Sequence, residues 1–195
     1  MNRRAEERGM SLVEITGVVA CIMILAAVAA PSVRAYSARA QVLAAGQKFR
    51  SEFFKARTDA IVSGRQTAIR FETCAEGPCY SVYRDGEHNG ITSEDIRDGI
   101  DYRVGGPFPL TAGAPGVHVG FKPGVPEIPP QRGILSGDPI RFGRSHMISF
   151  TPLGGATPGT FYLAGDSFQA AVRVTGQTGR VRLMIWVGQW QEASL

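Results

Sequence analysis

The chain has 195 residues, a formal net charge of +4 at pH 7 and an apolar content of 44%. A short leader and one apolar segment leave roughly 160 residues, enough for one domain with a hydrophobic core and too few for two. The modest net charge by itself identifies no partner.

The N-terminus joins a charged leader to an apolar segment. Residues 1–9 end in Gly9, and residues 10–31 are mostly apolar and long enough to span a bilayer as a helix. Glu14 interrupts this run, and a carboxylate in lipid costs roughly 2.5–3.5 kcal/mol, which points to a functional role. A cut after Gly9 would give Met10 a new amino group, which Glu14 of a neighbouring copy could neutralise.

Two simpler interpretations compete with this one. A secretory signal peptide would be cut near residues 27–29, but Glu14 and the length of the apolar run argue against it. A plain single-span anchor explains neither the spacing of Gly9 and Glu14 nor the presence of Pro31. In both membrane interpretations the arginines of the leader keep the N-terminus cytoplasmic and place the rest of the chain in the periplasm.

The segment from Gly9 to Glu14 resembles the prepilin signal of type IV pilins and type II secretion pseudopilins. The resemblance implies that a prepilin peptidase cuts after Gly9 and methylates Met10, and that Glu14 guides subunits into a filament in the bacterial inner membrane. It also implies that Pro31 kinks the helix. Inner-membrane lipid, the peptidase and other pilin or pseudopilin subunits are therefore the expected partners.

Residues 32–64 are predicted to continue the helix in amphipathic form. Apolar residues recur there at spacings of three and four, and Gly64 is a suitable C-terminal cap. The predicted buried stripe consists of Val42, Ala45, Phe49, Phe53, Ala56 and Ala60.

Residues 65–195 are predicted to form a β-rich periplasmic head. Alternating runs predict strands at 67–71, 146–151, 160–164, 170–175 and 180–187, and residues 105–139 read as a connection with at most one short strand near 117–121. The predicted fold class is α+β, with a long N-terminal helix packed on an antiparallel β-sheet head, as in pilins.

The three cysteines fall into two groups. Cys21 lies in the apolar segment as a small filler, whereas Cys74 and Cys79 flank a turn between two predicted strands. In an oxidising periplasm the latter pair predicts a disulfide. Half of a metal site is the alternative, but no second Cys or His pair would complete it.

The head also resembles the GspH/FimT family, through residues 53–61, Gly64-Arg65 and residues 176–182. The resemblance implies one of two functions. The first is a minor pseudopilin of a type II secretion system, which aids the export of folded proteins. The second is a FimT-like minor type IV pilin that binds DNA during uptake.

The DNA-binding alternative depends on the closing hairpin. With residues 176–179 as the turn, one side of the hairpin is wholly apolar and Arg173 directly faces Arg182 on the other. Opposed arginines repel, so an acidic neighbour or an anionic partner is expected nearby. The candidate DNA-binding residues are Arg173, Arg180, Arg182 and Trp186; a solvated face, or pairing with acids such as Asp166, is the alternative.

Residues 85–95 have the oxygen spacing of a calcium-binding loop. The candidate ligands are Asp85, Glu87, Asn89, Ile91, Ser93 and Asp95. Ile96 stands where the bidentate glutamate belongs, and a plain polar turn explains the same string. No other cofactor is expected.

The sequence contains no recognisable catalytic motif. The three histidines are scattered along the chain, and no nucleophile elbow, phosphate-binding glycine loop or metalloprotease motif is present. The protein is therefore expected not to be an enzyme.

Overall fold

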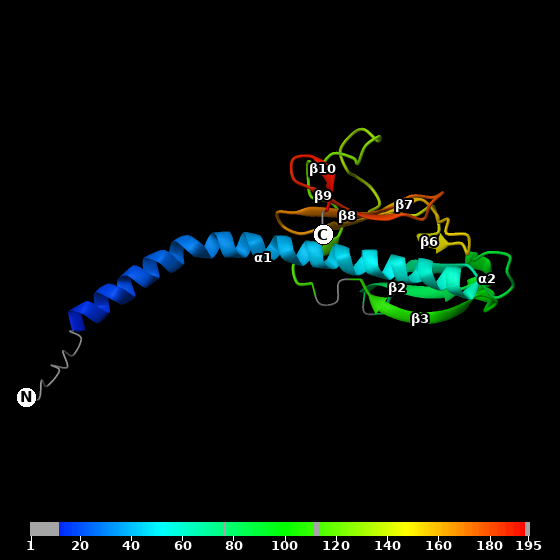
Figure 1. Ribbon diagram of the computed structural model, residues 1–195, viewed down its shortest axis with the longest axis horizontal. Coiled ribbons are helices and arrows are strands. Elements are labelled where there is room, and N and C mark those ends of the chain that lie inside the picture. The colour runs from blue at the N-terminus through cyan, green and yellow to red at the C-terminus, as the bar shows by residue number, and fades with distance from the viewer. Residues whose placement is uncertain (1–11, 76, 111–113, 194–195) are drawn as a thin grey trace, which may run out of the picture. The chain divides into compact units, whose positions relative to one another are not determined.

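The computed structural model describes residues 12–75, 77–110 and 114–193 (Figure 1). The chain divides into two compact units, Met1–Ser37 and Ala38–Leu195, and each is described by itself. Gly9 and Met10 lie outside the described residues.

The described part of the first unit is the beginning of helix α1, Leu12–Ser63. Its large apolar side chains are exposed, among them Ile22, Ile24 and Leu25. No described helix alone has both the length and the mean hydropathy of a membrane span. Two segments separated by a break, Leu12–Ala27 and Ser32–Ser63, meet the two criteria when they are taken together. The predicted span over residues 10–31 and the kink at Pro31 both stay predictions.

The second unit begins with the remainder of α1, where the predicted stripe is confirmed. All six of its residues are buried: Val42, Ala45, Phe49, Phe53, Ala56 and Ala60. The helix ends at Ser63, and Gly64 follows with a φ of 67°, the left-handed conformation that glycine adopts without strain at a helix end. The sequence therefore predicts both the buried face and the end of this helix.

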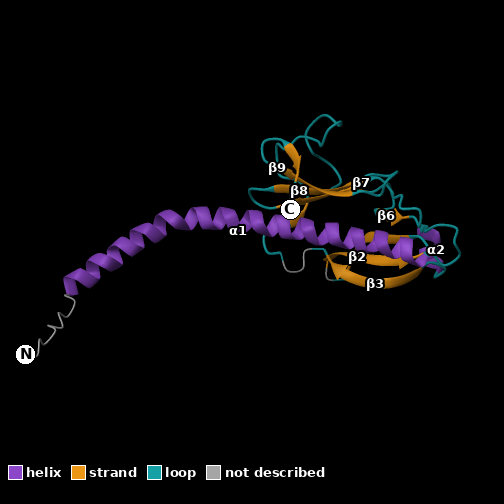
Figure 2. Ribbon diagram, viewed as in Figure 1, coloured by secondary structure: helices purple, strands orange, loops and turns teal. Residues whose placement is uncertain are grey.

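Two antiparallel sheets make up the rest of this unit (Figure 2). The first has the order β3-β2-β1-β6, with β1 at Thr67–Cys74, β2 at Gly77–Arg84, β3 at Tyr102–Pro109 and β6 at Met147–Phe150. The second has the order β10-β9-β8-β7-β4, and β5 also pairs with β7. Its strands are β4, His118–Val119; β5, Ile140–Arg141; β7, Gly159–Ala164; β8, Gln169–Val174; β9, Val181–Trp186; and β10, Trp190–Glu192.

One aromatic core joins α1 to both sheets. Phe49 of α1 lies 4.5 Å, between ring centroids, from Phe161 of β7, which in turn stacks 5.2 Å from Phe71 of β1. Phe53 contacts Phe71 and Phe142 edge-on. The α+β class, with the helix on an antiparallel head, is confirmed.

Four elements differ from the predicted pattern. β3 extends to Pro109, inside the stretch predicted as a connection, and β5, β10 and the short helix α2, Ser93–Asp98, were not predicted. β3 contains Gly105-Gly106-Pro107, which reads as a loop in a local scan. Its strand character comes from pairing with β2, where two register shifts between Tyr80 and Tyr83 accommodate the irregular backbone.

Candidate functional site

Glu14 lies in the first turn of α1 and its side chain is exposed. Within the described part of the chain, no hydrogen-bond or ion-pair partner contacts its carboxylate. The neighbouring apolar side chains Val13, Ile15 and Val18 are exposed as well. A carboxylate in such apolar surroundings is costly unless another group neutralises its charge.

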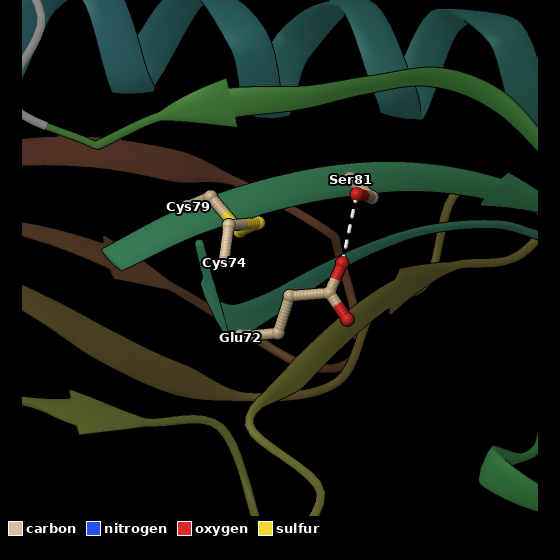
Figure 3. Close-up of a disulfide and its surroundings, with 4 residues drawn as sticks. All are labelled: Glu72, Cys74, Cys79 and Ser81. Atoms are coloured by element: carbon tan, nitrogen blue, oxygen red, sulfur yellow. Dashed lines mark hydrogen bonds between the residues drawn. A yellow bond between two sulfur atoms is a disulfide. The ribbon is translucent and has the colours of Figure 1, made fainter. Parts of the chain in front are cut away.

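The turn between β1 and β2 carries the predicted disulfide. Cys74 and Cys79 are bonded, with their Cα atoms 5.9 Å apart, and beside them Ser81 donates a 2.8 Å hydrogen bond to Glu72 (Figure 3). The side chains of Glu72, Cys74 and Cys79 lie within reach of one ion, but both sulfurs are used by the disulfide. The disulfide therefore links β1 covalently to β2 at the turn of this hairpin.

In the predicted calcium loop, residues 85–95, backbone N–H groups of the loop donate hydrogen bonds to a carboxylate of the same loop. Asp85 is 2% exposed and accepts hydrogen bonds from the backbone N–H groups of Glu87, His88 and Gly90, at 2.7–3.0 Å. Asp101 likewise accepts from Gly86 and Thr92.

The remaining calcium candidates have other surroundings. Asp95 lies in the first turn of α2, where its backbone N–H bonds to the Thr92 hydroxyl and its carboxylate accepts from that hydroxyl. Glu87 and Asn89 are exposed, Ile91 is buried, and Ser93 begins α2. Over this described loop the acidic side chains do not converge on one point, because Asp85 is turned toward backbone donors and Asp95 toward the helix cap.

The closing hairpin has the predicted register. Val174 pairs with Val181, Val172 with Leu183 and Arg173 with Arg182. The apolar side of the hairpin belongs to the main core. The opposite side, which carries the arginines, is the outer face of the second sheet.

A loop spanning residues 121–135 covers part of that outer face. Val125, Ile128 and Leu135 pack there with Tyr162 and Ala171. Arg141 holds the loop in place, because its Nη1 donates to both oxygens of Glu127, at 3.0 and 2.8 Å, and its guanidinium lies over the Phe121 and Tyr162 rings. Burial raises the pKa of Tyr162 against the opposing effect of the Arg141 charge.

The four predicted DNA-binding residues lie in different surroundings. Arg173 and Arg182 line a pocket beneath the loop, and Arg173 donates to the carbonyl of Pro129 at 2.8 Å. Trp186 is half-buried, and the centroid of its ring lies 5.8 Å from that of the Trp190 ring. The indole that was predicted to stack on a base therefore already contacts an aromatic side chain. Arg180 is exposed and pairs with Glu192 at 3.4 Å, not with Asp166.

Arg180 instead shares a groove with the exposed face of α1. The groove encloses about 580 Å³ and includes Arg50, Phe54 and Arg57 of the helix. Arg57 donates to the carbonyl of Thr178 at 3.2 Å, and Phe54 is 58% exposed. Local sequence spacing does not connect Arg50 and Arg57 with Arg180, because helix and hairpin lie more than a hundred residues apart and only the packing brings them together.

Comparison with protein families matches the chain to a family model described as type II transport protein GspH, over residues 45–179. Comparison with curated proteins and with solved structures gives no match. The matched stretch contains the buried part of α1 from Ala45 onward, both sheets as far as the hairpin turn, the disulfide and the covering loop.

Proposed function

The chain belongs to the family of the type II transport protein GspH, and from this membership we propose that it is a minor pseudopilin of a type II secretion system. The family consists of structural pseudopilins rather than enzymes, and it implies assembly with other pilin-like subunits. In this role the subunit is inserted in the inner membrane and displays its head in the periplasm. There it contributes to a filament that moves folded proteins outward.

The observation that carries this proposal is Glu14 on an uncovered apolar helix. The apolar side chains of residues 12–25 find no core in the described part of the chain, so lipid or the helices of other subunits must cover them. Glu14, which has no partner there, would be neutralised by the amino group that a neighbouring subunit exposes after cleavage between Gly9 and Met10. The charge pair would set the axial position of each subunit in the filament.

Complementation tests the proposal. A strain that lacks its own copy of this gene receives the wild-type chain, Glu14→Ala or the control Glu87→Ala, which removes an exposed acid from the head. We expect wild type and Glu87→Ala to restore export of folded proteins. Glu14→Ala should still lose residues 1–9, seen as a mass change of the membrane-bound chain, but should reduce export severalfold. Normal export without any copy of the gene would contradict the proposal.

The FimT-like alternative retains one specific observation, the open groove with Arg50, Arg57 and Arg180. Three guanidiniums along a groove suit nonspecific contact with DNA phosphates. The full chain in a neutral detergent should then bind duplex DNA, and Arg50→Ala/Arg180→Ala should lower the salt slope by roughly two. Absence of binding at low salt, with export lost in the deletion strain, would leave the secretion function.

A further inference from the structure

The pocket beneath the covering loop, here called the arginine pocket, encloses about 370 Å³. Arg173 of β8 and Arg182 of β9 form its charged side. The opposite walls are apolar: Ile128, Pro129 and Pro130 of the loop, Met184 of β9 and Trp190 of β10. The Trp190 indole is fixed by donating to the carbonyl of Pro126 at 2.7 Å, so this wall is built before any ligand arrives.

The two arginines place like charges directly opposite each other across neighbouring strands. Such pairs are destabilising, and partial burial makes the repulsion stronger than on an open surface. Arg173 donates one hydrogen bond, to the carbonyl of Pro129. In the described residues the Arg182 side chain has no hydrogen-bond or ion-pair partner, and its Nε is buried. A buried donor without an acceptor is costly, and no side chain in the described residues neutralises the Arg182 guanidinium that lines the pocket.

Two acidic side chains that are close in sequence to the pocket residues are already engaged. Glu127, which precedes the pocket wall, is held by Arg141, and Glu192, at the end of β10, pairs with Arg180. No acidic side chain is among the described residues that line the pocket. The missing negative charge must therefore come from outside the described chain.

From these observations we propose that the arginine pocket binds a carboxylate group between Arg173 and Arg182. Guanidinium forks match the two oxygens of a carboxylate, and the apolar walls match the methylene groups that carry it. The size and cover of the pocket fit an acidic side chain or a small free carboxylate. The backbone of a DNA duplex fits poorly, because the loop and Trp190 close one side of the pocket. An acidic residue of another pseudopilin subunit is the source that agrees with the proposed function, on which this part of the inference rests.

Thermal unfolding of the full chain in a neutral detergent tests the site. Sodium acetate and sodium butyrate are compared with sodium chloride at equal ionic strength. The variants are Arg182→Met, Arg182→Lys and the control Arg144→Met, which removes an exposed arginine elsewhere in the head. We expect both carboxylates to raise the unfolding midpoint of wild type and Arg144→Met above its value in chloride. Butyrate should act at severalfold lower concentration, because its chain contacts the apolar walls.

Arg182→Met should abolish the difference between carboxylate and chloride. In chloride its midpoint should equal or exceed that of wild type, because one of two opposed charges is gone. Arg182→Lys keeps the charge without the fork and should weaken the effect severalfold. An equal response to chloride and acetate, a carboxylate effect that persists in Arg182→Met, or a large loss of stability in that variant in chloride would each overturn the proposal.

Complementation of export then identifies the source of the carboxylate. If Arg182→Met loses carboxylate binding and also reduces export, the acid of another subunit is supported. If it loses carboxylate binding but exports normally, the site takes a free carboxylate. Because the binding measurement does not depend on export, failure of the carboxylate site remains distinguishable from failure of the secretion function.

Discussion

The two units differ in whether their apolar side chains are buried and their acidic side chains are paired within the described chain. The described part of the first unit leaves its apolar side chains exposed and its one acidic residue, Glu14, without a partner in the described chain. The second unit buries a group of phenylalanines in its main core and bonds its buried carboxylates internally. The comparison indicates that the second unit has a core of its own, whereas the apolar side chains of the first find none in the described chain.

The largest expected effect separates the two parts of α1. Phe53→Ala removes a fully buried ring from the shared core and should lower the free energy of unfolding by about 3–5 kcal/mol. Ile24→Ala, at a side chain that is 66% exposed, should change it by less than about 0.5 kcal/mol. Urea unfolding followed by the fluorescence of Trp186 and Trp190 measures both. Similar losses in the two variants would mean that the first part of the helix also belongs to the folded core.

A smaller effect concerns the internal carboxylates. Asp85→Ala deprives three backbone N–H groups of their acceptor and should cost about 2–3 kcal/mol, whereas Glu87→Ala, at an exposed side chain, should be nearly neutral. Because the Asp85 oxygens are occupied by these donors, a chelator should leave the unfolding midpoint of wild type unchanged. A calcium-dependent rise in that midpoint would instead support calcium binding by residues 85–95.

The smallest effect is a pH dependence in the core. Burial raises the pKa of Tyr80 to about 12, and the charge of Glu52 adds to the rise. The ordinary value is 10.0, so the unfolded chain loses this proton first. The contribution of Tyr80 to stability is therefore complete below pH 10 and falls as the pH rises toward 12. Tyr80→Phe should make the decline over this range shallower than in wild type, measured by urea unfolding at each pH.

Much of the fold was predictable from periodicity. The buried stripe of α1, the cap at Gly64 and the register of the β8–β9 hairpin all follow from local spacing, because side-chain direction in a helix or a hairpin is fixed by the residues within a few positions. The disulfide between Cys74 and Cys79 follows in the same way, since the two cysteines close a short turn between paired strands.

Long-range packing decided the rest. β3 is a strand because β2 pairs with it, despite its glycines and prolines, and Asp85 is an internal acceptor because the loop folds back over it. The predicted arginine group was divided, with Arg180 facing the helix groove and Arg173 and Arg182 enclosed by the loop of residues 121–135.

By itself, the sequence determined the amphipathic helix, the hairpin that opposes two arginines and the position of Glu14 within an apolar run. Only the tertiary structure decided which charges stay unpaired, because that depends on which distant segments supply acceptors. Glu127 forms an ion pair with Arg141, and Glu192 forms one with Arg180. No described residue accepts a hydrogen bond from the side chain of Arg182. Local spacing fixes the direction of a side chain, but the fold fixes its neighbours.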